Sequence, residues 1–573
     1  MPVSRSDRRR RAGRWLSLAA GAALLSAPTL AAAQQLVQQL GPPIPLVPQS
    51  VAPPRTGAPV GPEPGPPKSL LPSEPAGPAT PGWAGETAPE GEPLPRDFWR
   101  GTPRALAAFL LARLPDTTSP ALQAVERRLL LSPGAAPAGP DPGSPETALP
   151  VLRAAALLRL GEVEPARAVI AAMSERDRAA AAPLQVEADL LAGDLSQACD
   201  RVADAIRRDQ AMVWQRALVA CQALQGEGEK ADLGLQLLSE EKAGRDEALG
   251  VAVDALAGRP APAVIERLDA PEPLLLRALD AAGRRLAPPL VARLRGDLAA
   301  VVALDDKAPA ETRVLAAERA TATGALPVDR LRRLYGSVAE EEANGAASAA
   351  LDRARRFAAI LAAPDPVERL GRIVAFTENF PDREAGGFLL AARVVAAPLH
   401  EIGPDPTVAG AAAPAARLAL AAGDYEAARH WIEIDPAGAP ELGTVLALAT
   451  GQPATSQPAA GPSGTGGARG PMLLAVRSAL GDPIAPAEWT RLPAAAWAVP
   501  GLPAAPPAAW LDLSDAAGAK RVGEAALAAV LVAAPQGGLA KDPVALHSAV
   551  EGLRRIGLTS EARRLAAEAA LAP

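Results

Sequence analysis

The segment LLRLGEVEPARAVI (residues 157–170) carries a glycine at position 161 and an alanine five positions later. The same pair returns down the chain, with successive glycines 32, 33 and 32 residues apart. The four pairs are Gly161 and Ala166, Gly193 and Ala198, Gly226 and Ala231, and Gly258 and Ala263. Glycine can end one helix in the left-handed conformation, and an alanine early in the next helix lets two backbones cross closely. This period predicts four helix-turn-helix repeats over residues 145–275.

The segments after these glycines have the apolar spacing of amphipathic helices. In the first repeat the stripe is formed by Ala166, Val169, Ile170 and Met173, and in the second by Leu195, Cys199, Val202 and Ile206. Residues spaced in this way share one face of a helix. Asp194, followed three positions later by Gln197, also predicts a capping box at the start of a second helix.

At this period the chain resembles a tetratricopeptide-type helical-repeat protein, an α-solenoid with about 34 residues per repeat. The closest local match is Gly423-Asp424-Tyr425-Glu426-Ala427-Ala428, and Gly557 with Ala562 gives one more turn. The chain departs from the family pattern because most first helices lack the large aromatic residue, the closing proline is irregular, and the period blurs after Gly283. The resemblance implies an all-α array with a groove that binds another protein or peptide. An ordinary helical domain with accidental spacing is the alternative.

Composition agrees with closely packed helices. Aromatic residues make up only 3% of the chain while the hydrophobic set reaches 49%, so most apolar residues are alanine, leucine and valine. This mixture favours helices over a sheet core. The net charge of -6 comes from 58 basic and 64 acidic residues, and no basic stripe indicates a nucleic-acid partner.

The first 33 residues have the three parts of a secretory signal peptide. Arginines at positions 8–11 and 14 form a basic region, residues 15–27 an apolar stretch, and the alanines at 31–33 a cleavage motif. We therefore expect cleavage after Ala33 and export to the bacterial periplasm. An uncleaved membrane anchor is the alternative, and the route, Sec or twin-arginine, is left open.

The exported chain is not expected to insert into a membrane. A lipoprotein needs a cysteine at the cleavage site, and the only cysteines are Cys199 and Cys221. No later segment offers about 18 unbroken apolar residues. The mature protein is therefore predicted to be soluble in the periplasm.

Pro- and Gly-rich stretches divide the chain. Residues 34–96 cannot bury enough apolar surface to offset their ordering entropy, so they are predicted to form a disordered tether, with a proline-motif ligand as the alternative. The remaining divisions are an N-terminal helical hairpin and loop (97–144), the repeats (145–275), irregular helical repeats (276–451), a low-complexity loop (452–471) and a C-terminal helical segment (472–573). In the last segment we expect helices over 514–533, 543–556 and 560–572.

Two start signals define the predicted hairpin over residues 102–131. Thr102-Pro103 and Ser119-Pro120 each place an N-cap residue before a proline at the first helical position. The first of the two helices is expected to begin at Pro103 and the second at Pro120.

The sequence offers no pattern typical of an active site, so no catalytic, cofactor-binding or metal-ligating residue is predicted. His400, His430 and His547 have no second ligand at helical spacing, and the cysteines show no zinc pattern. The Gly-rich run at 464–470 lacks the lysine of a phosphate-binding loop. The neighbours His547 and Ser548 point in different directions on a helix and do not form a nucleophile and base pair.

The two cysteines are candidates for a structural disulfide. Cys199 lies in the second helix of one repeat and Cys221 in the first helix of the next, at equal distances from a turn near Gln210. In an antiparallel pair these positions face each other, and an oxidising compartment would preserve the bond. Helix axes usually lie about 8 to 10 Å apart, which would leave the Cα atoms too distant unless small neighbours allow close approach. The alternative is two buried thiols.

These features together predict a periplasmic protein–protein interaction scaffold, with no enzymatic activity. Stacked helix pairs form long curved surfaces that suit this role. An accessory or regulatory factor of cell-wall or envelope polysaccharide machinery is one alternative, and an envelope hydrolase is another. Trp489, Trp497 and Trp510 lie in a Pro-rich connection and are either a partner site or packed against the helices.

Overall fold

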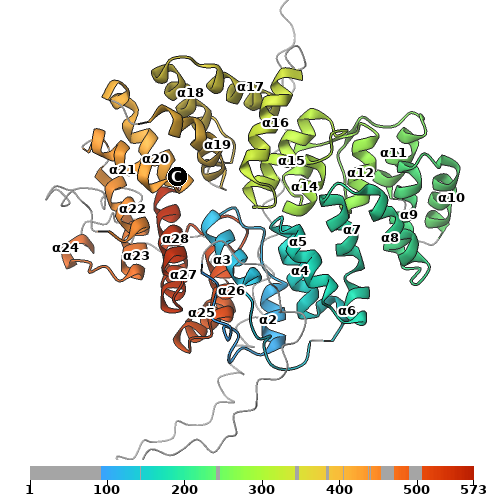
Figure 1. The fold of residues 1–573 in the computed structure, drawn as a ribbon, viewed down its shortest axis with the longest axis horizontal. Coiled ribbons are helices and arrows are strands. Elements are labelled where there is room, and N and C mark those ends of the chain that lie inside the picture. Colours follow the sequence, from blue (N-terminus) through green and yellow to red (C-terminus); the bar gives the residue numbers. More distant parts are fainter. Residues whose placement is uncertain are drawn as a thin grey trace, which may run out of the picture. The chain divides into compact units, whose positions relative to one another are not determined.

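The computed structural model describes most of the chain after residue 91. The described residues are 92–141, 143–240, 246–341, 348–382, 386–403, 406–436, 438, 440–452, 470–489 and 506–572. They all belong to one compact unit, Glu74–Pro573, and they form an array of α-helices packed against each other (Figure 1). The predicted all-α fold is therefore confirmed. The predicted signal peptide and most of the predicted tether lie outside the described residues.

Short helices follow one another along the whole described chain. The first half contains α2 (Arg104–Leu111), α3 (Pro120–Leu131), α4 (Leu149–Arg159), α5 (Val163–Ala171), α6 (Glu175–Ala180), α7 (Ala182–Leu191), α8 (Leu195–Ile206), α9 (Met212–Leu224), α10 (Gly228–Glu240), α11 (Glu247–Leu256), α12 (Pro273–Ala281), α13 (Pro288–Val291), α14 (Gly296–Ala303) and α15 (Ala310–Ala322). The second half contains α16 (Val328–Glu341), α17 (Ala349–Ala362), α18 (Pro366–Glu378), α19 (Gly387–Ile402), α20 (Ala412–Ala422), α21 (Tyr425–Ile434), α22 (Pro440–Thr450), α23 (Gly470–Leu480), α24 (Pro486–Trp489), α25 (Pro507–Gly518), α26 (Val522–Ala533), α27 (Pro543–Arg555) and α28 (Thr559–Leu571). In this part of the chain, no helix combines the length and apolar character of a membrane span.

The periodic glycines lie at the turns between helices, as the spacing predicts. Gly161, Gly193, Gly226 and Gly258 all have positive φ, between 74° and 84°. At the first three of these turns, the helices on either side pack together: α4 on α5, α7 on α8 and α9 on α10. The alanines of these three repeats, Ala166, Ala198 and Ala231, are fully buried at the crossings. The predicted pattern, a glycine in the turn and a buried alanine five residues later, is therefore confirmed for three helix pairs.

The fourth pair was predicted wrongly. Ala263 is exposed, and the chain forms the two-residue strand β1 (Val264–Ile265) instead of a second helix. β1 pairs in parallel with β2 (Arg285–Leu286), which follows α12. Pro260 and Pro262 explain the change, because each proline lacks an N–H and disfavours helical φ and ψ in the residue before it.

Two predicted helix boundaries also differ. The helix expected over 514–533 is two helices, α25 and α26, which fold back on each other at a turn where Lys520 has a φ of 59°. Gly518 ends α25, and the turn allows α26 to be buried almost all round. At the other end of the chain Ser119 caps α3 by accepting a hydrogen bond from Leu122 N, whereas Thr102 caps nothing and α2 begins at Arg104.

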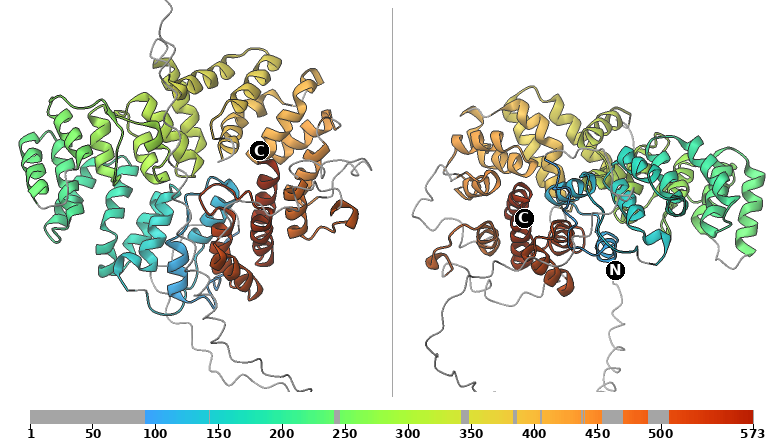
Figure 2. Two further views of the ribbon diagram at one scale, coloured as in Figure 1. Left: turned by 180° about the vertical axis from the view of Figure 1, so that it is seen from behind. Right: turned by 60° about the horizontal axis from the view of Figure 1, so that its bottom comes forward.

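The N-terminal hairpin packs against the C-terminal helices, a contact that the repeat pattern does not predict. α2 contacts α26, and α3 contacts both α26 and α28 (Figures 1 and 2). Two backbone hydrogen bonds join the segments: Gly523 N donates to Phe98 O at 2.9 Å, and Thr118 N donates to Gly537 O at 2.8 Å. We call this contact between residues 92–131 and 507–572 the closing seam.

A second long-range contact lies at the turn between α4 and α5. A Cβ atom built on Gly161 would lie 2.4 Å from the carbonyl oxygen of Ala325, in the turn after α15. Arg127 of α3 joins the two turns, since its Nη2 donates to Leu160 O at 3.0 Å and to Gly324 O at 2.6 Å. α3 therefore contacts the first repeat, the middle of the array and its last helix.

Candidate partner-binding pocket

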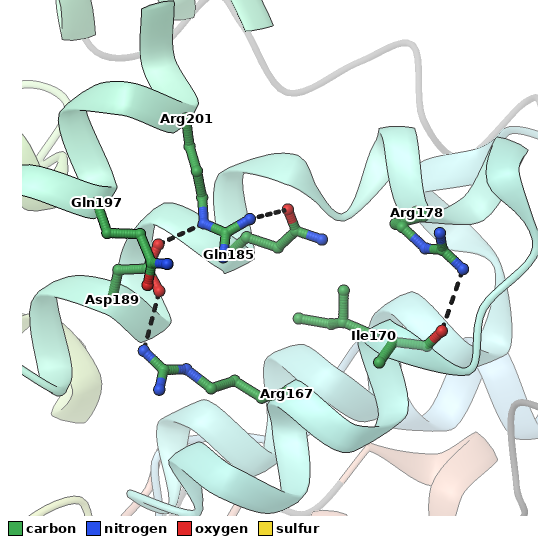
Figure 3. Close-up of a pocket in the computed structure, with 8 residues that line it drawn as sticks. Arg167, Ile170, Arg178, Gln185, Asp189, Gln197 and Arg201 are labelled. Atoms are coloured by element: carbon green, nitrogen blue, oxygen red, sulfur yellow. Dashed lines mark hydrogen bonds and ion pairs between the residues drawn. The ribbon is translucent and has the colours of Figure 1, made fainter. Parts of the chain in front are cut away.

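Helices α5 to α8 enclose a pocket of about 420 Å³. Its lining consists of Arg167, Ile170 and Ala171 from α5, Arg178 from α6, Gln185 and Asp189 from α7, and Gln197 and Arg201 from α8 (Figure 3). The turn at Gly193 folds α8 back on α7, and α5 also packs on α7, so consecutive helices of the first two repeats form the pocket. We call it the arginine pocket.

A buried carboxylate orders two of the arginines. Asp189 is 1% exposed, and its Oδ1 accepts a hydrogen bond from Arg167 Nη2 at 2.9 Å while its Oδ2 accepts one from Arg201 Nε (Figure 3). Arg201 Nη1 also donates to Gln185 Oε1 at 3.2 Å. Each guanidinium is thus held in one orientation by a charge-assisted hydrogen bond.

The third arginine is held by backbone carbonyls. Arg178 Nη2 donates to Ala171 O at 3.1 Å and to Met173 O at 2.9 Å, at the C-terminal end of α5. A cation at this position satisfies carbonyls that have no partner within the helix. Because these contacts use one nitrogen of an exposed side chain, Arg178 keeps further N–H groups at the pocket.

The pocket carries an excess of positive charge. Three arginines and one aspartate in the lining give a formal charge of +2, and the apolar side chain of Ile170 lies between them. At the rim Glu164, whose side chain is 79% exposed, pairs with Arg167 at 3.2 Å and offsets part of this charge. The arrangement suits a ligand that has a carboxylate beside an apolar group.

The polar part of the lining consists of arginine, aspartate and glutamine side chains. It contains no serine, cysteine, histidine or lysine, and both oxygens of Asp189 accept hydrogen bonds from arginine.

The two cysteines are bonded next to the pocket. A disulfide joins Cys199 of α8 to Cys221 of α9, with the Cα atoms 5.7 Å apart, and both residues are buried. α8 packs on α9 here, and the neighbouring Ala198 and Ala220 are fully or almost fully buried. Cys199 lies between the pocket residues Gln197 and Arg201, so the bond fixes α8 against its neighbour.

We expect the native protein to contain no free thiol. A thiol count on the unfolded, unreduced chain should give zero, and two thiols per chain would contradict the bond. Replacing both cysteines with alanine should lower the free energy of unfolding by roughly 3 kcal/mol, the loop-closure value for 22 residues of separation. Urea denaturation of the double variant against the oxidised wild type measures this loss.

The other residues considered in the sequence do not form a site together. His400 Nδ1 lies 3.2 Å from Asp424 Oδ2, and His547 Nδ1 lies 3.9 Å from Oε2 of Glu551, which also pairs with Arg555. Trp510 lies in α25 rather than in an irregular connection, and its Nε1 donates to Ser548 Oγ at 2.7 Å. Trp489 ends α24, while Trp497 and residues 464–469 of the glycine run lie outside the described residues, and Gly470 begins α23. Within the part of the chain that the structure describes, no cluster of three or more potential ligands could hold a metal ion.

The sequence analysis missed the pocket arginines. The available signal was the stretch VEADLL (residues 186–191), where the two acidic residues Glu187 and Asp189 stand among apolar ones and are both buried in α7. A buried carboxylate requires a cationic partner, so its position predicts arginines on the neighbouring helices. No protein-family model, curated protein or solved structure matches the chain at a significant level.

Proposed function

We propose that this protein is a periplasmic scaffold that binds a segment of another protein in the arginine pocket. The proposal rests on the two arginines, Arg167 and Arg201, that the buried Asp189 holds in place. Groups that are already ordered before binding lose little entropy when a ligand binds. The signal peptide predicted for residues 1–33 supports the location, and a disulfide beside the pocket is the bond that an oxidising compartment maintains.

The ligand class follows from the lining. Guanidinium groups bind carboxylates through paired hydrogen bonds, and the apolar floor at Ile170 accommodates an aliphatic side chain. We therefore propose that the bound segment contains aspartate or glutamate next to an apolar residue. A role in catalysis is not part of the proposal, since the lining holds no free nucleophile or base.

Binding should depend on Arg178 and Arg201. A library of short peptides is selected on the mature protein, and the dissociation constant of an enriched acidic peptide is measured by fluorescence anisotropy. Loss of a hydrogen bond to a charged group costs about 1.5 to 3 kcal/mol, so Arg201→Ala should weaken binding by roughly tenfold or more. Arg178→Ala should weaken it in the same direction while leaving the Asp189 pairs intact.

The control is Arg208→Ala, which removes an exposed arginine just beyond α8 that does not line the pocket. Its affinity should stay within about twofold to threefold of the wild type, because an exposed charge outside a contact contributes little. Equal affinities for all four proteins, or a selection that yields no acidic peptide, would contradict the proposal. Melting temperatures of the variants show whether they fold.

A further inference from the structure

The closing seam holds a carboxyl group at the end of a helix that is distant in the sequence. Glu568 of α28 accepts hydrogen bonds from Ser119 Oγ and from Ala121 N, the latter at 2.7 Å. Ser119 is the N-cap of α3, and Ala121 is in its first turn. The first N–H groups of a helix have no partner within it, and they carry a partial positive charge. Glu568 therefore caps α3 from the other end of the chain.

The rest of the closing seam fits tightly around this contact. A Cβ atom on Gly523 would lie 2.5 Å from the ring of Trp99, and one on Gly537 would lie 2.6 Å from Asp116 O. Arg128 of α3 and Glu561 of α28 form an ion pair at 2.6 Å. The two segments thus meet through backbone, apolar and charged contacts, and Glu568 is at the buried centre, 8% exposed.

We propose that the closing seam is a pH-sensitive latch, which holds α3 against α28 when Glu568 is protonated and loosens when Glu568 carries its charge. Opening would separate the N-terminal hairpin from the apolar faces of α26 and α28 that it covers. The proposal concerns the closing seam alone and does not depend on ligand binding in the arginine pocket.

The surroundings of Glu568 set the direction of the effect. Three ionisable side chains face Glu568, namely Arg393 of α19, Arg564 of α28 and Tyr425 of α21. Arg127 of α3 in turn faces Arg393. Burial raises the pKa of Glu568 to about 7, although the two hydrogen bonds and the arginines favour the charged form. The cost of burying the charge is therefore larger than the gain from its partners.

Proton linkage then gives the pH range. A carboxyl group whose pKa is higher in the docked state binds its proton more tightly there. Its protonation therefore stabilises docking most at pH values below 4.5, the ordinary pKa of a glutamate. This contribution is lost as the pH rises through about 7. Between pH 5.5 and pH 8.5 the equilibrium for opening should increase by about thirtyfold, if Glu568 reaches water when the seam opens.

Hydrogen exchange of the mature protein tests the latch. Protection of the amides in α3, corrected for the intrinsic effect of pH, should fall by about thirtyfold from pH 5.5 to pH 8.5. Glu568→Gln, which keeps an acceptor and cannot ionise, should remove most of this dependence and keep α3 protected at pH 8.5. Unchanged protection in the wild type, or an unchanged pH dependence in Glu568→Gln, would overturn the proposal.

Two control variants separate the latch from other effects in α3. Glu561→Gln breaks the ion pair with Arg128. Burial acts to raise the pKa of Glu561, but hydrogen bonds from Arg128 and Ser560 hold this pKa below its usual value. This variant should loosen α3 at both pH values and retain the pH dependence. Burial also raises the pKa of Glu126 to about 8, next to Arg159 of α4. If Glu126→Gln abolishes the dependence and Glu568→Gln does not, the assignment to Glu568 is wrong.

Discussion

Gly161→Ala is expected to lower the free energy of unfolding by roughly 2 to 5 kcal/mol. The residue has a φ of 75°, where an alanine costs about 1 to 2 kcal/mol. The new Cβ atom would also lie 2.4 Å from the carbonyl oxygen of Ala325, and forcing the two packed turns apart costs about 1 to 3 kcal/mol more. Urea denaturation followed by circular dichroism measures the loss.

Gly193→Ala is the matched control. Gly193 occupies the equivalent position in the next repeat with a φ of 84°, but a Cβ atom there would meet nothing within 4 Å. We expect a loss of only about 1 to 2 kcal/mol, from the backbone conformation alone. Equal losses in the two variants would show that the contact between the turns at 161 and 325 contributes nothing to stability.

The two glycines also show how far the sequence predicts this fold. Spacing reveals that both residues end a helix, because the requirement for a positive φ is local. It does not reveal that one of the turns meets Ala325, since that contact depends on how distant helices pack. The closing seam was missed for the same reason: Ser119 and Glu568 are 449 residues apart, and each one has an ordinary local role in its own helix.

The arginine pocket could be predicted only in part. Positions within a repeat place the side chains of α5 to α8 on neighbouring helices, and Glu187 and Asp189 are two carboxylates among apolar residues of α7. Which arginines reach it depends on the angles between the helices, and arginine is too common in this chain to be informative by itself. The fourth repeat failed because two prolines overrode a spacing that was otherwise regular.

Glu318→Ala is expected to lower the free energy of unfolding by about 3 to 5 kcal/mol. Glu318 of α15 is 8% exposed and forms a buried ion pair with Arg353 of α17, whose Nε lies 2.8 Å from Oε1. The hydroxyl of Tyr335 on α16 donates to the same oxygen at 2.7 Å. Removing the carboxylate leaves a buried guanidinium without its counter-charge, which costs far more than losing an exposed pair.

Tyr335→Phe should have a smaller effect, about 1.5 to 3 kcal/mol, because it removes one hydrogen bond to a charged group and keeps the ring. The ring itself packs against Phe357 and Phe376. Burial, together with the charge of Glu318, raises the pKa of the Tyr335 hydroxyl well above its usual value, so this group stays a donor throughout the neutral range.

Asp352→Ala is the control in this part of the array. Asp352 directly precedes Arg353 in α17 and pairs with Arg356 at 2.8 Å, and both side chains of this pair are about half exposed. Exposed pairs at this spacing contribute about 0.3 to 0.5 kcal/mol. The expected order of destabilisation is therefore Glu318→Ala, then Tyr335→Phe, then Asp352→Ala. A small loss in Glu318→Ala would mean that Arg353 reaches water or another acceptor, and that the three helices do not depend on this pair for their packing.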